Sequence, residues 1–195
     1  QAHLHVDLIA GLPGEDLASF GAGFDRLLAL GPHEIQLGIL KRLRGAPIAR
    51  HTEAYGLRFN PDPPYNVLAT DRIPFEAMQR MALFAQLWDR VANSGRHAVA
   101  LAAMLGTAAG ARPASPVPDS PLPASPFWRF MAFADWMAAR DDGTGRWSEE
   151  RLRTSIGQWL REAAGADREA MDAALATPGR AARAARAGLE RQSRR

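Results

Sequence analysis

The sequence predicts an α/β fold plus an all-α part: one strand–helix–strand unit at the end of an α/β barrel, followed by helices. Two short segments near the start alternate apolar and polar residues and flank a helical pattern, which is typical of a parallel βαβ unit. The apolar residues after position 74 recur with helical spacing. The chain has 195 residues, of which 47% are hydrophobic, which suits one globular domain or a small domain with an appendage.

The first strand is expected over residues 3–9 and the second over residues 34–41. Each strand has one apolar side, formed by Leu4, Val6 and Leu8 in the first and by Ile35, Leu37 and Ile39 in the second. The other side carries His3, His5, Asp7, Glu34, Gln36 and Gly38. Because fully buried parallel strands are usually apolar on both faces, this polar side predicts the lumen of a ligand-binding barrel. Two parallel strands do not make a stable sheet alone, so we expect the other strands in preceding sequence.

The helix between these strands is expected to begin after Asp16, which is a suitable N-cap residue. Gly31 and Pro32 end it in the usual way. Its apolar face is formed by Leu17, Phe20, Phe24, Leu27 and Leu28.

The sequence divides into four predicted regions: the strand–helix–strand unit at 1–45, an irregular wrap-around connection at 46–74, a helical domain at 75–177 and a basic tail at 178–195. Within the helical domain we expect helices at 74–93, 96–105, 127–139 and 168–176, and one that begins after Ser148. A proline-rich loop is expected at 106–126.

Two of these helices have informative patterns. The segment at 127–139 is apolar almost all round, which favours a buried helix over an aromatic wall that faces a ligand. The helix after Ser148 has a narrower apolar stripe, formed by Leu152, Ile156, Trp159 and Leu160.

The composition excludes several kinds of site and location. The chain has no cysteine, so it cannot itself supply a disulfide or the thiolates of an iron–sulfur cluster. No apolar run approaches the roughly 20 residues of a membrane span, and no signal peptide precedes the first strand, so we expect a cytoplasmic protein without a membrane partner. The formal net charge is +3 and nearly all basic residues are arginine, as in a GC-rich coding bias. We expect no nucleic-acid partner, although the tail at 178–195 leaves one open.

The candidate site lies at the ends of the two strands, from Asp7 to Glu15 and from Leu40 to Gly45, because parallel α/β folds bind ligands there. Gly11 permits close approach of a ligand to the backbone, and Asp7 can accept hydrogen bonds from a hydroxyl or an amine. The alternative interpretation is a tight turn that only packs well. His3 and His5 have the spacing of a metal pair, but no third ligand is evident and we predict no metal site in this chain.

The stretch "HVDLIAGLPGEDLASFGAGFDRLLALGPHEIQLGILKRLRGAPI" resembles the late strand–helix–strand portion of radical S-adenosylmethionine enzymes. The recurring blocks are D-L-I-x-G-L-P-G-E and L-K-x-L-x-G. The likeness is greatest to the branch that carries a cobalamin-binding domain and to the coproporphyrinogen-oxidase-like branch. Further along, "PPYNVLAT" and "NSGR" resemble a helical domain found at the C-terminus of such cobalamin-linked proteins.

This resemblance implies a partial barrel that holds S-adenosylmethionine on a [4Fe–4S] cluster, whose CxxxCxxC loop is absent from this chain. It implies that Asp7 contacts the nucleoside and that Leu40 and Lys41 approach it, and we expect Gly11, at the end of the first strand, to belong to the same cofactor-binding site. Cobalamin is a further cofactor that the resemblance admits. The expected partners are an upstream barrel, a cobalamin-binding region and a small-molecule substrate.

The leading interpretation is therefore a C-terminal fragment of a radical S-adenosylmethionine enzyme, which contributes the end of the barrel and a helical cap and is not catalytic alone. Two alternatives stay open. One is a non-catalytic helical adaptor module whose basic tail contacts nucleic acid, and the other is a truncated gene product without activity.

Overall fold

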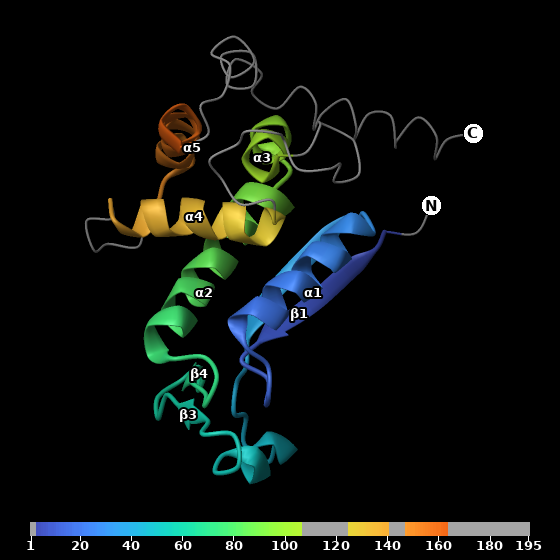
Figure 1. Ribbon diagram of the computed structural model, residues 1–195, viewed down its shortest axis with the longest axis vertical. Coiled ribbons are helices and arrows are strands. Elements are labelled where there is room, and N and C mark those ends of the chain that lie inside the picture. The colour runs from blue at the N-terminus through green and yellow to red at the C-terminus, as the bar shows by residue number, and fades with distance from the viewer. Residues whose placement is uncertain (1–2, 107–124, 141–146, 164–195) are drawn as a thin grey trace. The chain divides into compact units, whose positions relative to one another are not determined.

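The structure is a computed structural model that describes residues 3–106, 125–140 and 147–163. It divides into two compact units, Gln1–Asp89 and Arg90–Arg195. The described residues form five α-helices and two two-stranded sheets (Figure 1). The mixed α/β class is thereby confirmed, whereas the barrel stays a prediction.

The first unit begins with the expected strand–helix–strand arrangement. Strand β1 (His5–Ala10) is followed by helix α1 (Leu17–Ala29) and strand β2 (Glu34–Ile39), and the two strands pair in parallel. In Figure 1 the helix α1 runs alongside β1. The register places Val6 opposite Ile35, His5 opposite Glu34 and Asp7 opposite Gln36, so the apolar side and the polar side of the two strands coincide.

Helix α1 begins as the sequence predicts. The Asp16 carboxylate accepts a hydrogen bond from the Ser19 main-chain N–H at 2.8 Å, and the Ser19 hydroxyl accepts one from the Asp16 N–H at 3.1 Å. This reciprocal capping box satisfies two amides of the first turn. Phe20 and Phe24 are buried on the inner face of the helix.

The connection after β2 contains a short 3₁₀ helix (Pro47–His51) and an antiparallel pair of very short strands, β3 (Arg58–Phe59) and β4 (Val67–Ala69). It is anchored by buried apolar side chains, as predicted for a wrap-around segment. The buried cluster consists of Leu40, Leu57, Val67, Ile73 and Met78.

Helix α2 (Phe75–Trp88) belongs to the first unit, whereas the predicted boundary at 74/75 placed it with the later helices. It packs against β2 and β4 through Met78 and Trp88. The rings of Phe84 and Trp88 lie edge-to-face with Phe24 of α1, at 5.6 Å and 4.8 Å between centroids. These contacts tie α2 to the βαβ unit.

A π-helical turn (Asp89–Asn93) begins at the last residue of the first unit and continues into the second. The described α-helices of the second unit are α3 (Ala98–Leu105), α4 (Pro126–Ala138) and α5 (Glu149–Ala163). Helix α4 is buried along most of its length, as its apolar pattern predicts, and all four stripe residues of α5 are buried. The Ser148 hydroxyl accepts a hydrogen bond from the Arg151 N–H at 3.1 Å, which confirms the predicted N-cap.

Three predicted features lie largely or wholly outside the described residues: the proline-rich loop at 106–126, the helix at 168–176 and the basic tail at 178–195. Among the helices that the structure describes, none is long and apolar enough to cross a membrane.

Candidate functional site

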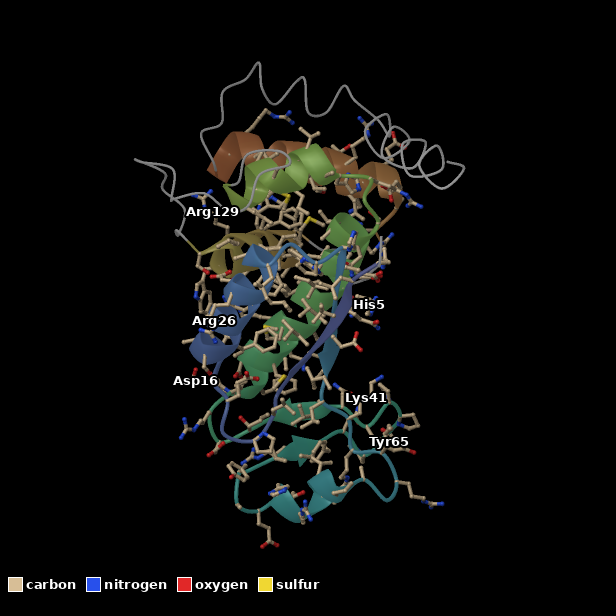
Figure 2. All side chains as sticks on the ribbon, turned by 90° about the vertical axis from the view of Figure 1, so that its right-hand side faces the viewer. His5, Asp16, Arg26, Lys41, Tyr65 and Arg129 are labelled. Atoms are coloured by element: carbon tan, nitrogen blue, oxygen red, sulfur yellow. The ribbon has the colours of Figure 1, made fainter. Side chains whose placement is uncertain are left out.

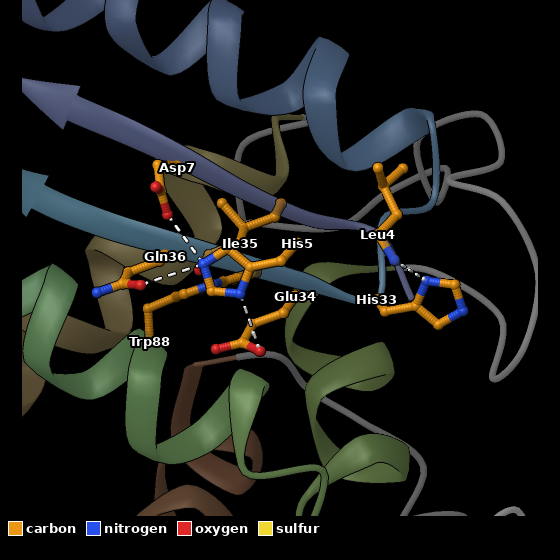
Figure 3. A network of polar contacts seen from close by, with 8 residues as sticks. All are labelled: Leu4, His5, Asp7, His33, Glu34, Ile35, Gln36 and Trp88. Carbon is orange, nitrogen blue, oxygen red and sulfur yellow. Dashed lines mark hydrogen bonds and ion pairs between the residues drawn. The ribbon is translucent and has the colours of Figure 1, made fainter. Parts of the chain in front are cut away.

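Four polar side chains meet on the side of the β1–β2 sheet that carries no apolar row (Figure 3). The His5 Nε2 atom lies 2.9 Å from the Asp7 Oδ1 atom and 3.1 Å from the Gln36 Oε1 atom. On the other side of the ring, His5 Nδ1 lies 3.2 Å from Glu34 Oε2. We call these four residues the His5 cluster.

The contacts of the His5 cluster favour a protonated imidazole. Carboxylate oxygens and an amide oxygen only accept hydrogen bonds, so both ring nitrogens must act as donors. The hydrogen bonds to Asp7 and then to Glu34 raise the pKa of His5 above its usual 6.5. The open side of the sheet therefore places His5 between two carboxylates, which favour its cationic form.

Asp7 has the exposure that a ligand contact needs. Its side chain is 68% exposed, and within the described residues it bonds only through Oδ1. Ile9, the next residue on the same side of β1, is 46% exposed. The two side chains together offer an acceptor and an apolar surface on one face.

The two strands differ in how their outer edges are used. The main-chain N–H and C=O groups of the even-numbered residues along β1 point toward β2. This follows because the Leu4 and Ala10 carbonyls accept hydrogen bonds from Glu34 N–H at 3.3 Å and Leu40 N–H at 2.9 Å. The N–H and C=O groups of the odd-numbered residues His5, Asp7 and Ile9 therefore point away from β2. Within the part of the chain that the structure describes, these groups make no main-chain hydrogen bond.

The outer edge of β2, in contrast, is engaged by its own unit. Trp88 of α2 donates its Nε1–H to the Ile35 carbonyl oxygen at 3.0 Å. Just beyond the strand, Lys41 forms an antiparallel bridge with Asn66. Among the described residues, the outer edge of β1 is thus open along its whole length, whereas β2 is engaged near its two ends and the Leu37 and Ile39 groups between them make no main-chain hydrogen bond.

Gly11 and Leu40 of the predicted site are packed into the core. Gly11 has a φ of +90°, and a Cβ atom at this position would lie 2.6 Å from Val67 Cγ1. Leu40 belongs to the buried cluster, and both its N–H and its C=O are bonded within the unit. The interpretation of this turn as one that packs well is therefore supported for these two residues.

Lys41 is exposed at the end of β2, but it lies at a different level of the sheet from Asp7. The β1–β2 register places Asp7 opposite Gln36, so Lys41 lies five residues further along the sheet, or roughly 16 Å beyond Asp7. Figure 2 shows the labelled His5 and Lys41 at different levels of the first unit. The structure therefore does not bring Asp7 and Lys41 together.

His3 and His5 do not converge on a common point. The His3 ring lies 4.8 Å from the His33 ring, while His5 turns to the carboxylates of its own cluster. Asp7 and Glu34 approach opposite nitrogens of His5, so the three do not surround one position. Among the described residues, no group of three or more His, Cys, Asp or Glu side chains is arranged to hold a metal ion.

A second polar cluster lies within the second unit and joins the segment before α3 to the start of α5. Glu149 pairs with Arg96 at 3.0 Å and with the nearly buried His97 at 2.9 Å. Arg90 also donates to the Trp147 carbonyl oxygen. Of the residues in these contacts, Arg96 belongs to the segment "NSGR".

The cofactors implied by the resemblance fit this chain unequally. The exposed Asp7 oxygen suits a hydroxyl or amine donor of S-adenosylmethionine. A [4Fe–4S] cluster does not fit, because the chain has no cysteine to ligate it. Any cluster ligands must come from outside this chain.

The sequence did not single out the role of His5. The alternation placed His5, Asp7, Glu34 and Gln36 on one side, but their contacts depend on the register between strands that are far apart in sequence. The sequence feature that could have predicted the cluster is the pair of polar rows. Once the two strands are aligned in parallel, these rows place His5 beside the carboxylates of Asp7 and Glu34.

Comparison with known families gives one match. Residues 53–114 match a family described as a protein of unknown function (DUF4080). The matched segment contains β3, β4, α2, the π-helical turn and α3, so it spans parts of both units. No curated protein matches the chain.

Proposed function

We propose that this chain is part of a radical S-adenosylmethionine enzyme, in which it forms the last strand–helix–strand unit of the barrel and a helical cap. The domain that matches residues 53–114 is commonly found in radical S-adenosylmethionine and cobalamin-binding proteins. The D-L-I-x-G-L-P-G-E block of β1 and its following turn is the sequence feature that agrees with this assignment.

The observation that carries the proposal is the asymmetry of the β1–β2 sheet. A two-stranded parallel sheet needs further strands for stability, and here the outer main-chain groups of the described residues are free along the whole of β1, whereas the outer edge of β2 is engaged near Ile35 and Lys41. Further strands of a barrel would therefore add at β1, while β2 remains the last strand beside α2. The polar side of the sheet, with Asp7, would then face the lumen.

Within this enzyme, Asp7 would accept a hydrogen bond from the nucleoside part of S-adenosylmethionine, and Ile9 would offer apolar contact on the same face. Gly11 and Leu40 would act by packing the turn, and Lys41 would lie at the rim. When both are bound, a reduced [4Fe–4S] cluster would supply the electron that cleaves S-adenosylmethionine, which yields a 5′-deoxyadenosyl radical.

The remaining partners are proposed on the same basis. The cysteines that hold the cluster would belong to an upstream region of the full-length protein, because none is available here. A cobalamin-binding region is a further partner, with cobalamin as an additional cofactor. The helices α3, α4 and α5 would cover a small-molecule substrate or contact the cobalamin-binding region.

The experiment is anaerobic reconstitution of the full-length protein with iron and sulfide, followed by reduction and incubation with S-adenosylmethionine. We expect a [4Fe–4S] electron paramagnetic resonance signal and formation of 5′-deoxyadenosine. A full-length protein that takes up no cluster would refute the proposal.

A further inference from the structure

We infer that His5 is a positioning residue of the proposed cofactor-binding face: its imidazolium form fixes the Asp7 carboxylate by bridging it to Glu34 and Gln36 of the neighbouring strand. The inference rests on the proposed function for the identity of the ligand. The bridge itself is independent of that function, because it follows from the geometry of the two strands.

The His5 ring contacts three polar side chains among the described residues. His5 Nε2 serves both Asp7 Oδ1, at 2.9 Å, and Gln36 Oε1, at 3.1 Å. His5 Nδ1 serves Glu34 Oε2 at 3.2 Å. Partners on both edges of the ring fix its plane, and they come from both strands of the sheet (Figure 3).

The bridge restricts the orientation of the Asp7 side chain. An aspartate that is 68% exposed on a strand would otherwise sample several rotamers. The contact through Oδ1 selects one orientation and leaves Oδ2 available to a ligand donor. Such preorganisation lowers the cost of ordering the side chain when the ligand binds.

The complete bridge requires both N–H protons of the His5 ring. A neutral imidazole has only one N–H, so loss of the proton breaks either the pair of contacts at Nε2 or the contact at Nδ1. Within the described residues, the charged groups that act on His5 are Asp7 of its own strand and Glu34 of β2.

Because these contacts raise the pKa of His5, the complete bridge is present below pH 6.5 and is lost as the pH rises through the folded-state value. His3 and His33 contact each other, and neither is among the groups that act on His5. A titration of His5 therefore reports on the Asp7 and Glu34 contacts.

The first arm of the test is nuclear magnetic resonance of the full-length protein with ¹⁵N-labelled histidine, in which His5→Gln assigns the signal. We expect His5 to titrate above pH 6.5, and both Asp7→Asn and Glu34→Gln to lower the midpoint. Asp62→Asn is the matched control, because Asp62 is an exposed aspartate of the same unit and should leave the midpoint unchanged. A midpoint that Asp7→Asn does not move would overturn the inference.

The second arm measures the affinity of the reconstituted full-length protein for S-adenosylmethionine. Glutamine at position 5 keeps a donor near the Nε2 position and can still hold Asp7, whereas asparagine keeps a donor only near the Nδ1 position. We expect His5→Gln to bind within about twofold of the wild type and His5→Asn to bind roughly tenfold more weakly, the value of one charge-assisted hydrogen bond. In the Asp7→Ala background, His5→Asn should add no further loss.

The two arms separate the inference from the proposed function. A His5→Asn protein that binds as tightly as the wild type would refute the positioning role, even if the titration moves as expected. A wild-type protein that takes up the cluster but binds no S-adenosylmethionine would refute the proposed ligand, and the titration arm would then decide whether the bridge exists.

Discussion

Trp88 donates its indole N–H to the main-chain oxygen of Ile35 across 53 positions of the sequence, with a distance of 3.0 Å between Nε1 and O. Both residues are buried, at 2% and 3% exposure. This one bond joins the last helix of the first unit to the outer edge of β2. It therefore engages the outer edge of β2 near the start of that strand.

Trp88→Phe should remove this bond and leave the Ile35 oxygen buried without that donor. We expect the free energy of unfolding to fall by about 1–3 kcal/mol, the usual cost of an unsatisfied buried polar group. Urea unfolding followed by far-ultraviolet circular dichroism measures the change. Trp128→Phe is the control, because Trp128 is half-buried and has no Nε1 hydrogen bond among the described residues; equal losses for the two variants would contradict the role of the bond.

Gly11→Ala should destabilise the first unit for two separable reasons. The φ of +90° disfavours any side chain, and the new Cβ would lie 2.6 Å from Val67 Cγ1. We expect a loss of about 2–4 kcal/mol in the free energy of unfolding, from backbone strain and overpacking together.

Gly45→Ala isolates the backbone contribution, since Gly45 has a φ of +78° and nothing lies within 4 Å of its added Cβ. That variant should lose only about 1 kcal/mol. The same urea experiment compares the two. If Gly45→Ala is as damaging as Gly11→Ala, the close packing of the turn on Val67 is not what requires glycine.

Glu149→Gln should weaken the contacts that join the segment before α3 to α5. Glu149 pairs with both Arg96 and His97, and the Arg96 side chain is 64% exposed, so screening limits the loss to about 0.5–1 kcal/mol at pH 7. Glu150→Gln changes the next residue of the same helical turn and should cost less. A larger loss for Glu150→Gln in urea unfolding would show that the helix terminus, and not the two pairs, dominates.

Glu15→Gln should stabilise the protein at neutral pH. Burial, followed by the charge of Asp16, raises the pKa of Glu15, and its Oε2 atom is buried without a hydrogen-bond partner among the described residues. A raised carboxyl pKa means that the charged form is costly in the folded state. This cost is absent below pH 4.5 and develops as the pH rises through the folded-state pKa.

The gain from Glu15→Gln should therefore be present at pH 7 and disappear near pH 4, when the wild-type carboxyl is protonated as well. Because Glu15 is only partly buried, we expect a gain below about 1 kcal/mol. Unfolding in urea at both pH values measures it, with the exposed Glu53→Gln as control. A gain that is equal at pH 4 and pH 7 would have to come from something other than the charge.

Local patterns predicted much of this fold. The capping box of α1, the Ser148 cap and the buried stripe of α5 depend on residues within one or two turns, so the sequence contains their signals directly. The parallel pairing of β1 and β2 also follows locally, because a single helix connects them.

Other features depend on contacts between distant residues and could not be predicted. The strands β3 and β4 have two and three residues and are set by the packing of Val67 beneath Gly11. The place of α2 in the first unit depends on the Trp88–Ile35 bond. The His5 cluster required the register of two strands, so the sequence identified Asp7 as a candidate but not the histidine that holds it.

The most direct test of the central claim is the affinity of the reconstituted full-length protein for S-adenosylmethionine after Asp7→Ala. If the polar side of the β1–β2 sheet forms a wall of the cofactor site, the dissociation constant should rise roughly tenfold while the iron and sulfide content stays at the wild-type value. Asp62→Ala, an exposed aspartate away from that side of the sheet, should change neither quantity. Unchanged affinity for S-adenosylmethionine in the Asp7→Ala protein would contradict the account.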